Sequence, residues 1–330
     1  MEPINSALAA LKIVLETKEN EKLLIITNEN LMDVAEIFAF AGLKQGMSVS
    51  IKVLSEDARP LKEAPQNLLE AIALLKPDVI INCLESCPEE TPFRIELLQA
   101  EGKANARVGH MPGVYMSMLT SGPLALSENE YTKMRENGKK LIAILEKSDR
   151  IKVTTEKGTN FELSVKSRKW FTDVKTDKIG KKWGNLPCGE IYVAPIENSL
   201  NGTIVADGAI GDLSAPSDLL TLKVVKGKVV EIRYRDKHFE DKVNALLSVD
   251  KQASVVGELG IGLNPKASSK SDSMLEAEKA KETIHIAFGR NLDFQGINGS
   301  KTHRDFLISN PTILVEGKIL MSKGKIIFEE

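Results

Sequence analysis

The sequence predicts an α/β protein in which an N-terminal βαβ domain with a parallel sheet is followed by a β-rich α+β domain. Short apolar runs alternate with segments of helical periodicity through the first half, which is typical of βαβ units. Period-two segments joined by glycine turns replace that pattern in the second half. The length of 330 residues suits about two domains. We place their boundary near Asp149, which gives domains at 1–149 and 150–330.

Strands and helices should alternate in the first half. The run at 23–26 is short and wholly apolar, as expected of a buried strand. Apolar residues from 31 to 41 then follow the i, i+3, i+4, i+7 spacing of an amphipathic helix, with Asn28 where an N-cap is expected. The next expected elements are a strand at 49–53, a helix at 68–75 and a strand at 79–81. This half has no GxGxxG or GxxxxGKS/T loop, so we expect no nucleotide-phosphate site there.

A long helix is expected at 128–146, where the first half ends. Ser127 precedes it as the N-cap, and Glu130 lies three residues later, in the position of a capping box. Period-two alternation predicts mainly strands after this helix. The expected elements are strands at 151–153 and 161–165, hairpins at 224–230 and 319–327, and helices at 240–247 and 273–281.

Composition and charge exclude several classes of protein. Hydrophobic residues make up 42% and charged residues 27% of the chain, which is usual for globular proteins and not for disordered or fibrous ones. The net charge is −2, so we expect neither nucleic acid nor a membrane among the partners. No apolar run approaches the ~20 residues needed to cross a bilayer, and no signal-peptide pattern begins the chain. Three cysteines do not make a disulfide framework, and we expect a cytoplasmic protein.

The residues best suited to chemistry lie in the second half. His303 and Asp305 are two apart, so on a strand they point to one face and could bind a metal; a surface hydrogen bond between them is the alternative. Glu190 and Glu258 each lie among glycine and apolar residues, where a buried carboxylate needs a cation or a donor. An edge-strand or loop position is the alternative for each. Together with His285, these side chains suit two adjacent metal ions if one carboxylate bridges.

Four motifs occur along the second half, in the order NLPCGEIYVAP, GELGIGLNP, TIHIAFG and SKTHRD. Together they resemble the motif series of the aminopeptidase T and aminopeptidase S family of thermophilic metallopeptidases. The resemblance extends weakly into the first half through RVGHMPG at 107–113. It implies a two-domain, dimeric, cytosolic aminopeptidase with an enclosed site. It also implies that a pair of divalent ions, zinc, cobalt or manganese, is bound by Glu190, Glu258, His285, His303 and Asp305.

The chain departs from the family near the expected site. The family has a tyrosine seven residues after the histidine of TIHIAFG, and this chain has Leu292 there, which can neither ligate a metal nor transfer a proton. The resemblance also reaches mononuclear iron(II) ring-cleaving enzymes similar to dihydroxypyridine dioxygenase. In that alternative, one iron would be held by His285, His303 and Asp305, a two-histidine, one-carboxylate site. A relative that binds a ligand without catalysis is the third alternative.

Three further residues are candidate catalytic groups. Glu278 could act as a general base, with Lys279 beside it as a clamp for a substrate anion, although both also fit a solvated helix face. Arg290 could hold a substrate carboxylate, and Tyr192 could partly replace the missing tyrosine. We therefore predict that the second domain binds metal and carries catalysis. The predicted function is a homodimeric, metal-dependent aminopeptidase in which metal-activated water hydrolyses small peptides.

Overall fold

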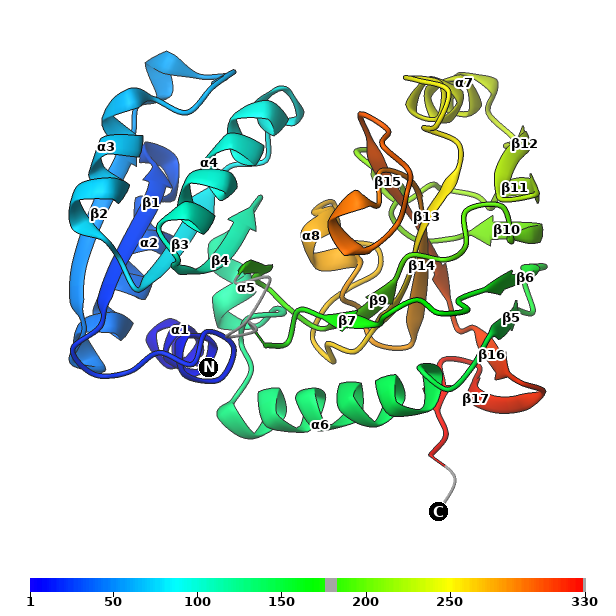
Figure 1. The fold of residues 1–330 in the computed structure, drawn as a ribbon, viewed down its shortest axis with the longest axis horizontal. Helices are drawn as coiled ribbons and strands as arrows, with labels where there is room; N and C mark the ends of the chain where they lie inside the picture. The colour runs from blue at the N-terminus through cyan, green and yellow to red at the C-terminus, as the bar shows by residue number, and fades with distance from the viewer. Residues whose placement is uncertain (176–182, 329–330) are drawn as a thin grey trace. The chain divides into compact units, whose positions relative to one another are not determined.

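The computed structural model describes residues 1–175 and 183–328 (Figure 1). Contacts divide the chain into two compact units. The first comprises Met1–Arg135 and Asp173–Cys188, and the second comprises Glu136–Thr172 and Gly189–Glu330. This division differs from a single boundary near Asp149, because a segment after residue 172 returns to the first unit before the chain continues the second.

A five-stranded parallel sheet forms the centre of the first unit, in the order β2-β1-β3-β4-β8. Its strands are β1 (Lys22–Asn28), β2 (Ser48–Leu54), β3 (Val79–Leu84), β4 (Arg107–Pro112) and β8 (Trp183–Asn185). The helices are α1 (Pro3–Ile13), α2 (Met32–Lys44), α3 (Gln66–Leu75), α4 (Thr91–Lys103) and α5 (Met116–Thr120). The 3-10 helices are η1 (Glu29–Leu31), η2 (Glu56–Ala58) and η3 (Pro88–Glu90).

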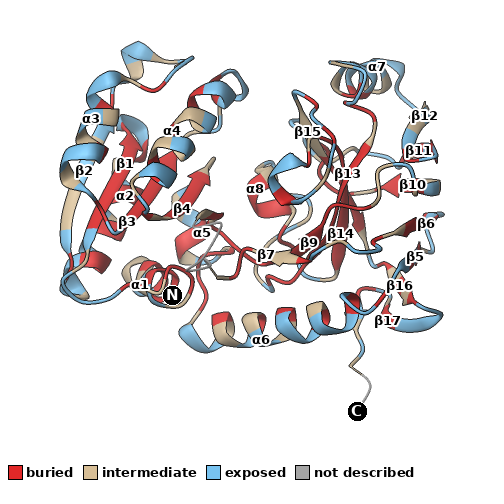
Figure 2. Ribbon diagram, in the orientation of Figure 1, coloured by how far each residue is buried: buried red, intermediate tan, exposed pale blue. Residues whose placement is uncertain are grey.

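Burial on both faces explains the apolar runs in the sequences of β1 and β3. Every residue of β3 is buried, and only the first residue of β1 is exposed (Figure 2). The prediction that Asn28 caps the following helix is wrong. Its Oδ1 accepts a hydrogen bond from the Glu85 amide at 2.9 Å, and η1 intervenes before α2. Strand β8 was not predicted, because three residues carry too little periodicity to be recognised.

Two antiparallel sheets make up the second unit within the described residues. The larger has the order β12-β11-β10-β6-β5-β16-β17-β18, and the smaller has the order β15-β14-β13-β9-β7. The strands of the larger sheet are β5 (Arg150–Thr154), β6 (Asn160–Ser164), β10 (Asn201–Ala206), β11 (Leu220–Val225), β12 (Lys228–Arg233), β16 (Thr312–Val315), β17 (Lys318–Ser322) and β18 (Lys325–Ile326). Those of the smaller are β7 (Phe171–Thr172), β9 (Glu190–Val193), β13 (Val256–Gly262), β14 (Thr283–Gly289) and β15 (His303–Ser309). Helices α7 (Lys237–Leu246), α8 (Met274–Ala277) and η4 (Leu292–Phe294) also belong to this unit.

Local sequence signals decide several of these elements. Helix α6 (Glu128–Leu145) begins with the predicted capping box: the Ser127 amide donates to Glu130 Oε2 at 2.7 Å, and the Glu130 amide donates to Ser127 Oγ at 3.2 Å. Both predicted hairpins form, as β11–β12 and β17–β18. The predicted helix at 273–281 is wrong beyond Ala277. After Ala277 the backbone instead forms hydrogen bonds with the backbone of Asn264, whose amide donates to the carbonyl oxygen of Lys279 at 2.8 Å.

The predicted fold class, a parallel α/β sheet followed by a β-rich part, is confirmed. Among the described residues, no helix combines the length and the apolar character that crossing a membrane requires.

Candidate metal centre

One face of the smaller sheet carries the five predicted ligands. The strand register aligns Glu258, Ala287 and Asp305 across β13, β14 and β15. Glu190 of β9 pairs with Gly262 of β13, which shares this face because alternate strand residues point the same way. The same alternation places the two histidines with them. The face therefore presents Glu190, Glu258, His285, His303 and Asp305.

A glycine opposite His285 makes room for the imidazole ring. Gly260 pairs directly with His285 across β13 and β14. A Cβ atom at position 260 would lie 2.0 Å from Nε2 of His285, so the ring occupies the space that any other side chain would take. The sequence reasoning did not single out Gly260. The sequence signal that could have identified Gly260 is the pair of glycines at 260 and 262, which occupy alternate positions of an apolar strand.

The Glu258 carboxylate lies between the two imidazoles. Its Oε1 is 3.2 Å from His285 Nε2, and its Oε2 is 3.4 Å from His303 Nε2. Glu190 Oε2 approaches His285 Nε2 at 3.3 Å, and Asp305 Oδ1 approaches His303 Nε2 at 3.6 Å. Donor atoms of Glu190, Glu258 and His285 all lie within 4.8 Å of one another. The donor set thus has two halves that share Glu258.

Backbone geometry orients the His303 ring. Its Nδ1 lies 2.7 Å from the carbonyl oxygen of Arg290. Because a carbonyl can only accept, Nδ1 carries a proton and donates it, so Nε2, which faces Glu258 and Asp305, is the nitrogen that offers a lone pair whenever the ring is neutral. Metal-binding histidines are held in this way by a partner on the second nitrogen. The Arg290 side chain itself turns to Asp293, with Nε 2.9 Å from Oδ2. A role for Arg290 in holding substrate stays a prediction.

An unsatisfied oxygen tests whether a cation fits these residues. Asp305 Oδ1 is buried and has no hydrogen-bond partner in the part of the chain that the structure describes. Its 3.6 Å separation from His303 Nε2 is too long for a hydrogen bond. A buried carboxylate oxygen without a partner is unfavourable, and a cation beside Asp305, His303 and Glu258 would satisfy it. The residues present therefore fit a divalent metal.

A fully buried lysine adjoins the donor set. Lys279 is 0% exposed, and its Nζ lies 2.5 Å from Glu190 Oε1 and 2.6 Å from Glu278 Oε1. This pairing leaves Glu190 Oε2 to face His285. The alternative that Glu278 and Lys279 belong to a solvated helix face is wrong. They lie beyond α8, at 14% and 0% side-chain exposure.

Electrostatics in the site favour a cation. Burial acts to raise the pKa of Glu258, but hydrogen bonds from His285 and His303 outweigh it and hold that pKa well below the usual range. Burial acts to lower the pKa of both imidazoles, yet the carboxylates around them keep each pKa well above its ordinary value. Without metal, protons on the imidazoles therefore supply part of the positive charge that a metal ion would supply.

The remaining candidate, Tyr192, lies in an aromatic part of this unit. The Tyr192 ring stacks on Phe171 with ring centroids 5.8 Å apart, and it meets Phe294 edge-on at 5.5 Å. Phe294 in turn lies 6.1 Å from the His303 ring, so the aromatic cluster adjoins one predicted ligand. Leu292 begins η4 and is 46% exposed. A proton-transfer role for Tyr192 stays a prediction.

The comparisons with known proteins identify the family. The model of the thermophilic metalloprotease (M29) family matches residues 127–330, more than half of the chain. The chain belongs to the thermophilic metalloprotease family. Membership places the chain, at the level of the family, among metal-dependent peptidases. This membership confirms the resemblance carried by the four motifs and supports divalent-metal binding.

Two curated relatives of this chain carry different activities in their names. It is 21% identical over 202 residues to 2,5-dihydroxypyridine 5,6-dioxygenase of Pseudomonas putida, a match covering 57% of each chain. It is 23% identical over 177 residues to Aminopeptidase 2 of Geobacillus stearothermophilus, covering 48% of this chain and 42% of the relative. The matches thus span about half the length of these relatives. Family membership alone therefore does not specify the reaction.

Solved structures support the fold of this chain along nearly its whole length. AmpT from Thermus thermophilus has a TM-score of 0.75 at 16% identity, with 99% of both chains covered. The 2,5-dihydroxypyridine dioxygenase from Pseudomonas putida has a TM-score of 0.68 at 15% identity, with 100% of this chain and 98% of the other covered. At these identities the likeness establishes the fold alone.

Proposed function

We propose that this chain is a metal-dependent aminopeptidase that binds two divalent ions, zinc, cobalt or manganese, and removes N-terminal residues from small peptides. The observation that carries the proposal is the position of Glu258, whose two carboxylate oxygens face His285 and His303 separately. A bridging carboxylate with an imidazole on each side suits two adjacent ions. Membership of a metalloprotease family supports peptide hydrolysis.

Each half of the donor set would hold one ion in this proposal. Glu190, Glu258 and His285 form one half, and Glu258, His303 and Asp305 form the other. Bound divalent ions polarise a peptide carbonyl and lower the pKa of bound water. The protein's contribution is to hold the donors in place and to bring Glu258 within reach of both halves.

Glu278 is the candidate for proton transfer. Burial raises the pKa of its carboxyl to about 8, although Lys279 opposes the shift. A carboxyl with a pKa near neutrality can take up or release a proton at the working pH, as a general acid–base group must. Its contact with Lys279 Nζ at 2.6 Å fixes the carboxyl in position. We propose that Glu278 passes a proton to the amine that leaves when the peptide bond breaks.

Ring cleavage by one iron(II) ion is the second candidate function. The observation that favours it is the difference between the histidines: the His303 side chain is 31% exposed, whereas His285 is 0% exposed. A single ion beside His303 would lie at the accessible half of the site. Its donors there would be Glu258, His303 and Asp305. The set predicted from the sequence, His285, His303 and Asp305, differs from this one because His285 instead faces Glu190 and Glu258.

Metal content and substrate turnover separate the two functions. Protein purified without chelator is analysed by inductively coupled plasma mass spectrometry. It is then assayed on leucine p-nitroanilide with zinc, cobalt or manganese, and on 2,5-dihydroxypyridine with iron(II) and oxygen. The proposal predicts two ions per chain and release of p-nitroaniline. One iron per chain with ring cleavage, and no hydrolysis with any metal, would overturn it. Asp305→Ala should abolish turnover, while Asp241→Ala, 64% exposed on α7, is the matched control.

We also propose that the chain forms a homodimer, in line with the family resemblance. Val225 and Val230, on strands β11 and β12, are 42% and 57% exposed, so this edge of the larger sheet presents apolar side chains. Light scattering should give twice the chain mass of 36.2 kDa at micromolar concentration. A mass of one chain across that range would refute the dimer.

A further inference from the structure

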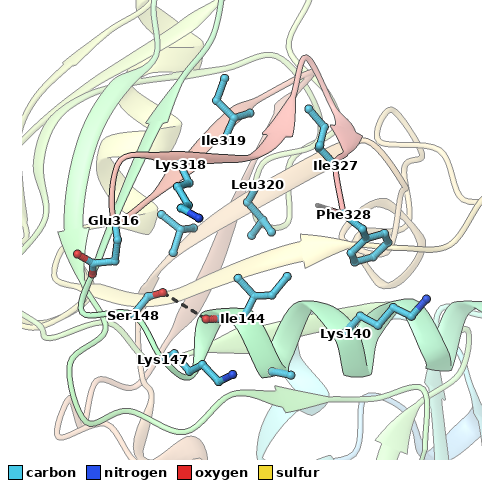
Figure 3. A pocket seen from close by; sticks show the side chains of 12 residues that line it. Lys140, Ile144, Lys147, Ser148, Glu316, Lys318, Ile319, Leu320, Ile327 and Phe328 are labelled. Atoms are coloured by element: carbon cyan, nitrogen blue, oxygen red, sulfur yellow. Dashed lines mark hydrogen bonds between the residues drawn. The ribbon is translucent and has the colours of Figure 1, made fainter. Parts of the chain in front are cut away.

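A network of buried polar side chains supports the turn between β14 and β15. This turn spans residues 290–302, and His303 follows it directly. Two bonds close its base: the Arg290 amide donates to the Thr302 carbonyl at 2.7 Å, and the Arg290 carbonyl accepts from His303 Nδ1 at 2.7 Å. The turn therefore carries the atom that orients His303. None of its residues lines the groove beside α6 that Figure 3 shows.

Asn291 ties the two sides of the turn together. It is 0% exposed, its amide donates to the Asn298 carbonyl at 3.1 Å, and its Oδ1 accepts from the Asn298 amide at 2.8 Å. Its Nδ2 also donates to the Gly257 carbonyl of β13 at 3.3 Å. The Asn291 N–H and the Arg290 carbonyl belong to one planar peptide group. Bonds that fix Asn291 therefore also fix the direction of the Arg290 carbonyl.

Glu197 holds this arrangement from a segment 94 residues earlier in the chain. Its Oε1 accepts from Asn291 Nδ2 at 3.0 Å and from the Ile297 amide at 2.8 Å. Its Oε2 accepts from Arg168 Nη2 at 2.7 Å, and both of these side chains are 12% exposed. Hydrogen bonds to an ionised carboxylate are roughly twice as strong as neutral ones. Glu197 therefore secures both ends of the segment 291–297.

The two histidines of the candidate metal centre are held in different ways. His285 is 0% exposed, its ring fills the space opposite Gly260, and its Nδ1 has no hydrogen-bond partner among the described residues. Close packing holds that ring. The His303 side chain is 31% exposed, and two of its contacts come from the turn: the bond from Nδ1 and the edge-on approach of the Phe294 ring, with centroids 6.1 Å apart. The accessible imidazole therefore depends on the turn for its orientation.

We infer that Glu197 is a positioning residue for the candidate metal centre. It acts on the Arg290 carbonyl through Asn291, and that carbonyl sets the orientation of His303. The inference rests on the proposed function, in which the half of the donor set that contains His303 binds a divalent ion. Groups that hold the second nitrogen of a metal-binding histidine typically contribute about 10–100-fold to metal affinity.

Zinc binding to the full chain tests this inference. Titration calorimetry measures the affinities, and nitrogen-15 signals of His285 and His303 assign each binding event to one half of the site. Glu197→Ala should weaken zinc binding at the His303 half by about tenfold or more, and leave the other half within about twofold. Asp293→Ala is the matched control, since Asp293 lies in the same turn, is 55% exposed and contacts only the side chain of Arg290 in the bonds described above. It should leave both halves within about twofold of the wild-type protein.

The Nδ1 proton of His303 gives a readout that a loss of stability would not single out. The chain has four histidines, so their signals in the zinc-loaded, histidine-labelled protein can be resolved. The bond to the Arg290 carbonyl should protect this proton from exchange with water in the wild-type protein. Glu197→Ala should abolish that protection, whereas Asp293→Ala should retain it. The His285 signals should stay unchanged in both variants.

Gly296→Ala tests the route through Asn291 with Glu197 left in place. A Cβ atom at position 296 would lie 1.9 Å from Asn291 Cγ, so this variant should displace the Asn291 side chain and reproduce the effect of Glu197→Ala. Circular dichroism verifies that each variant is folded, and Gly296→Ala carries the test if Glu197→Ala is not.

Three results would overturn the inference. They are unchanged zinc affinity and unchanged His303 protection in Glu197→Ala, equal weakening of both halves, and an effect of Glu197→Ala that Gly296→Ala does not share. One zinc per wild-type chain would instead refute the two-ion proposal. The inference would still be supported if Glu197→Ala weakened the binding of that ion and exposed the His303 proton.

Discussion

Replacing Lys279 by methionine should destabilise the metal-free protein strongly. Methionine is similar in length and leaves no large cavity, so the change mainly removes the charge. In the wild-type protein Lys279 Nζ lies 2.5 Å from Glu190 Oε1 and 2.6 Å from Glu278 Oε1, and the lysine is 0% exposed. Removing one partner of a buried ion pair costs about 3–5 kcal/mol, because the remaining charge is left uncompensated.

Urea unfolding followed by circular dichroism measures this effect. At pH 7 in the presence of chelator, we expect Lys279→Met to lower the free energy of unfolding by about 3–5 kcal/mol. A saturating divalent metal should stabilise the variant more than the wild-type protein, because the ion takes over neutralisation of Glu190. Lys270→Met is the control, since Lys270 is exposed and should change stability by no more than ~0.5 kcal/mol. A loss below about 1 kcal/mol for Lys279→Met would refute the assigned ion pairs.

Three further predictions concern the site and the first unit. Asp305→Ala should lower the metal bound per chain, measured by mass spectrometry, while the far-ultraviolet circular dichroism spectrum stays unchanged, since the change removes a carboxylate that faces His303 and leaves the backbone pairing of β15 in place. Gly260→Ala should cost about 1–3 kcal/mol and weaken metal binding, because its Cβ would lie 2.0 Å from His285 Nε2; thermal unfolding with and without metal checks both effects. Burial raises the pKa of the Glu101 carboxyl, on α4, from 4.5 to about 8, although the hydrogen bond from Asn82 opposes the shift. Its contribution to the free energy of unfolding is therefore complete below pH 4.5. That contribution is lost as pH rises towards 8, at up to ~1.4 kcal/mol per pH unit. Glu101→Gln should therefore gain stability relative to the wild-type protein between pH 5 and 8 in urea unfolding, and equal slopes for the two proteins would contradict the assignment.

Local sequence patterns were sufficient for those elements whose determinants lie within a few residues. The apolar runs of β1 and β3 predicted buried parallel strands, and Ser127 with Glu130 predicted the start of α6. The glycine turns predicted both hairpins. His303 and Asp305 could be placed on one face from their spacing alone, because side chains alternate along any strand.

Such local patterns could not predict which residues come together in the candidate site. Glu190 and Asp305 are 115 residues apart (305 − 190), and their common face follows from the order β15-β14-β13-β9, which long-range hydrogen bonds establish. The same tertiary pairing places Gly260 under His285, and the bonds from Asn264 end α8 so that Lys279 meets Glu190. By itself, the sequence determined which residue types are available for a metal centre and which local elements carry them. Only the tertiary structure decided which of them meet, because strand order and register depend on burying whole faces contributed by distant segments.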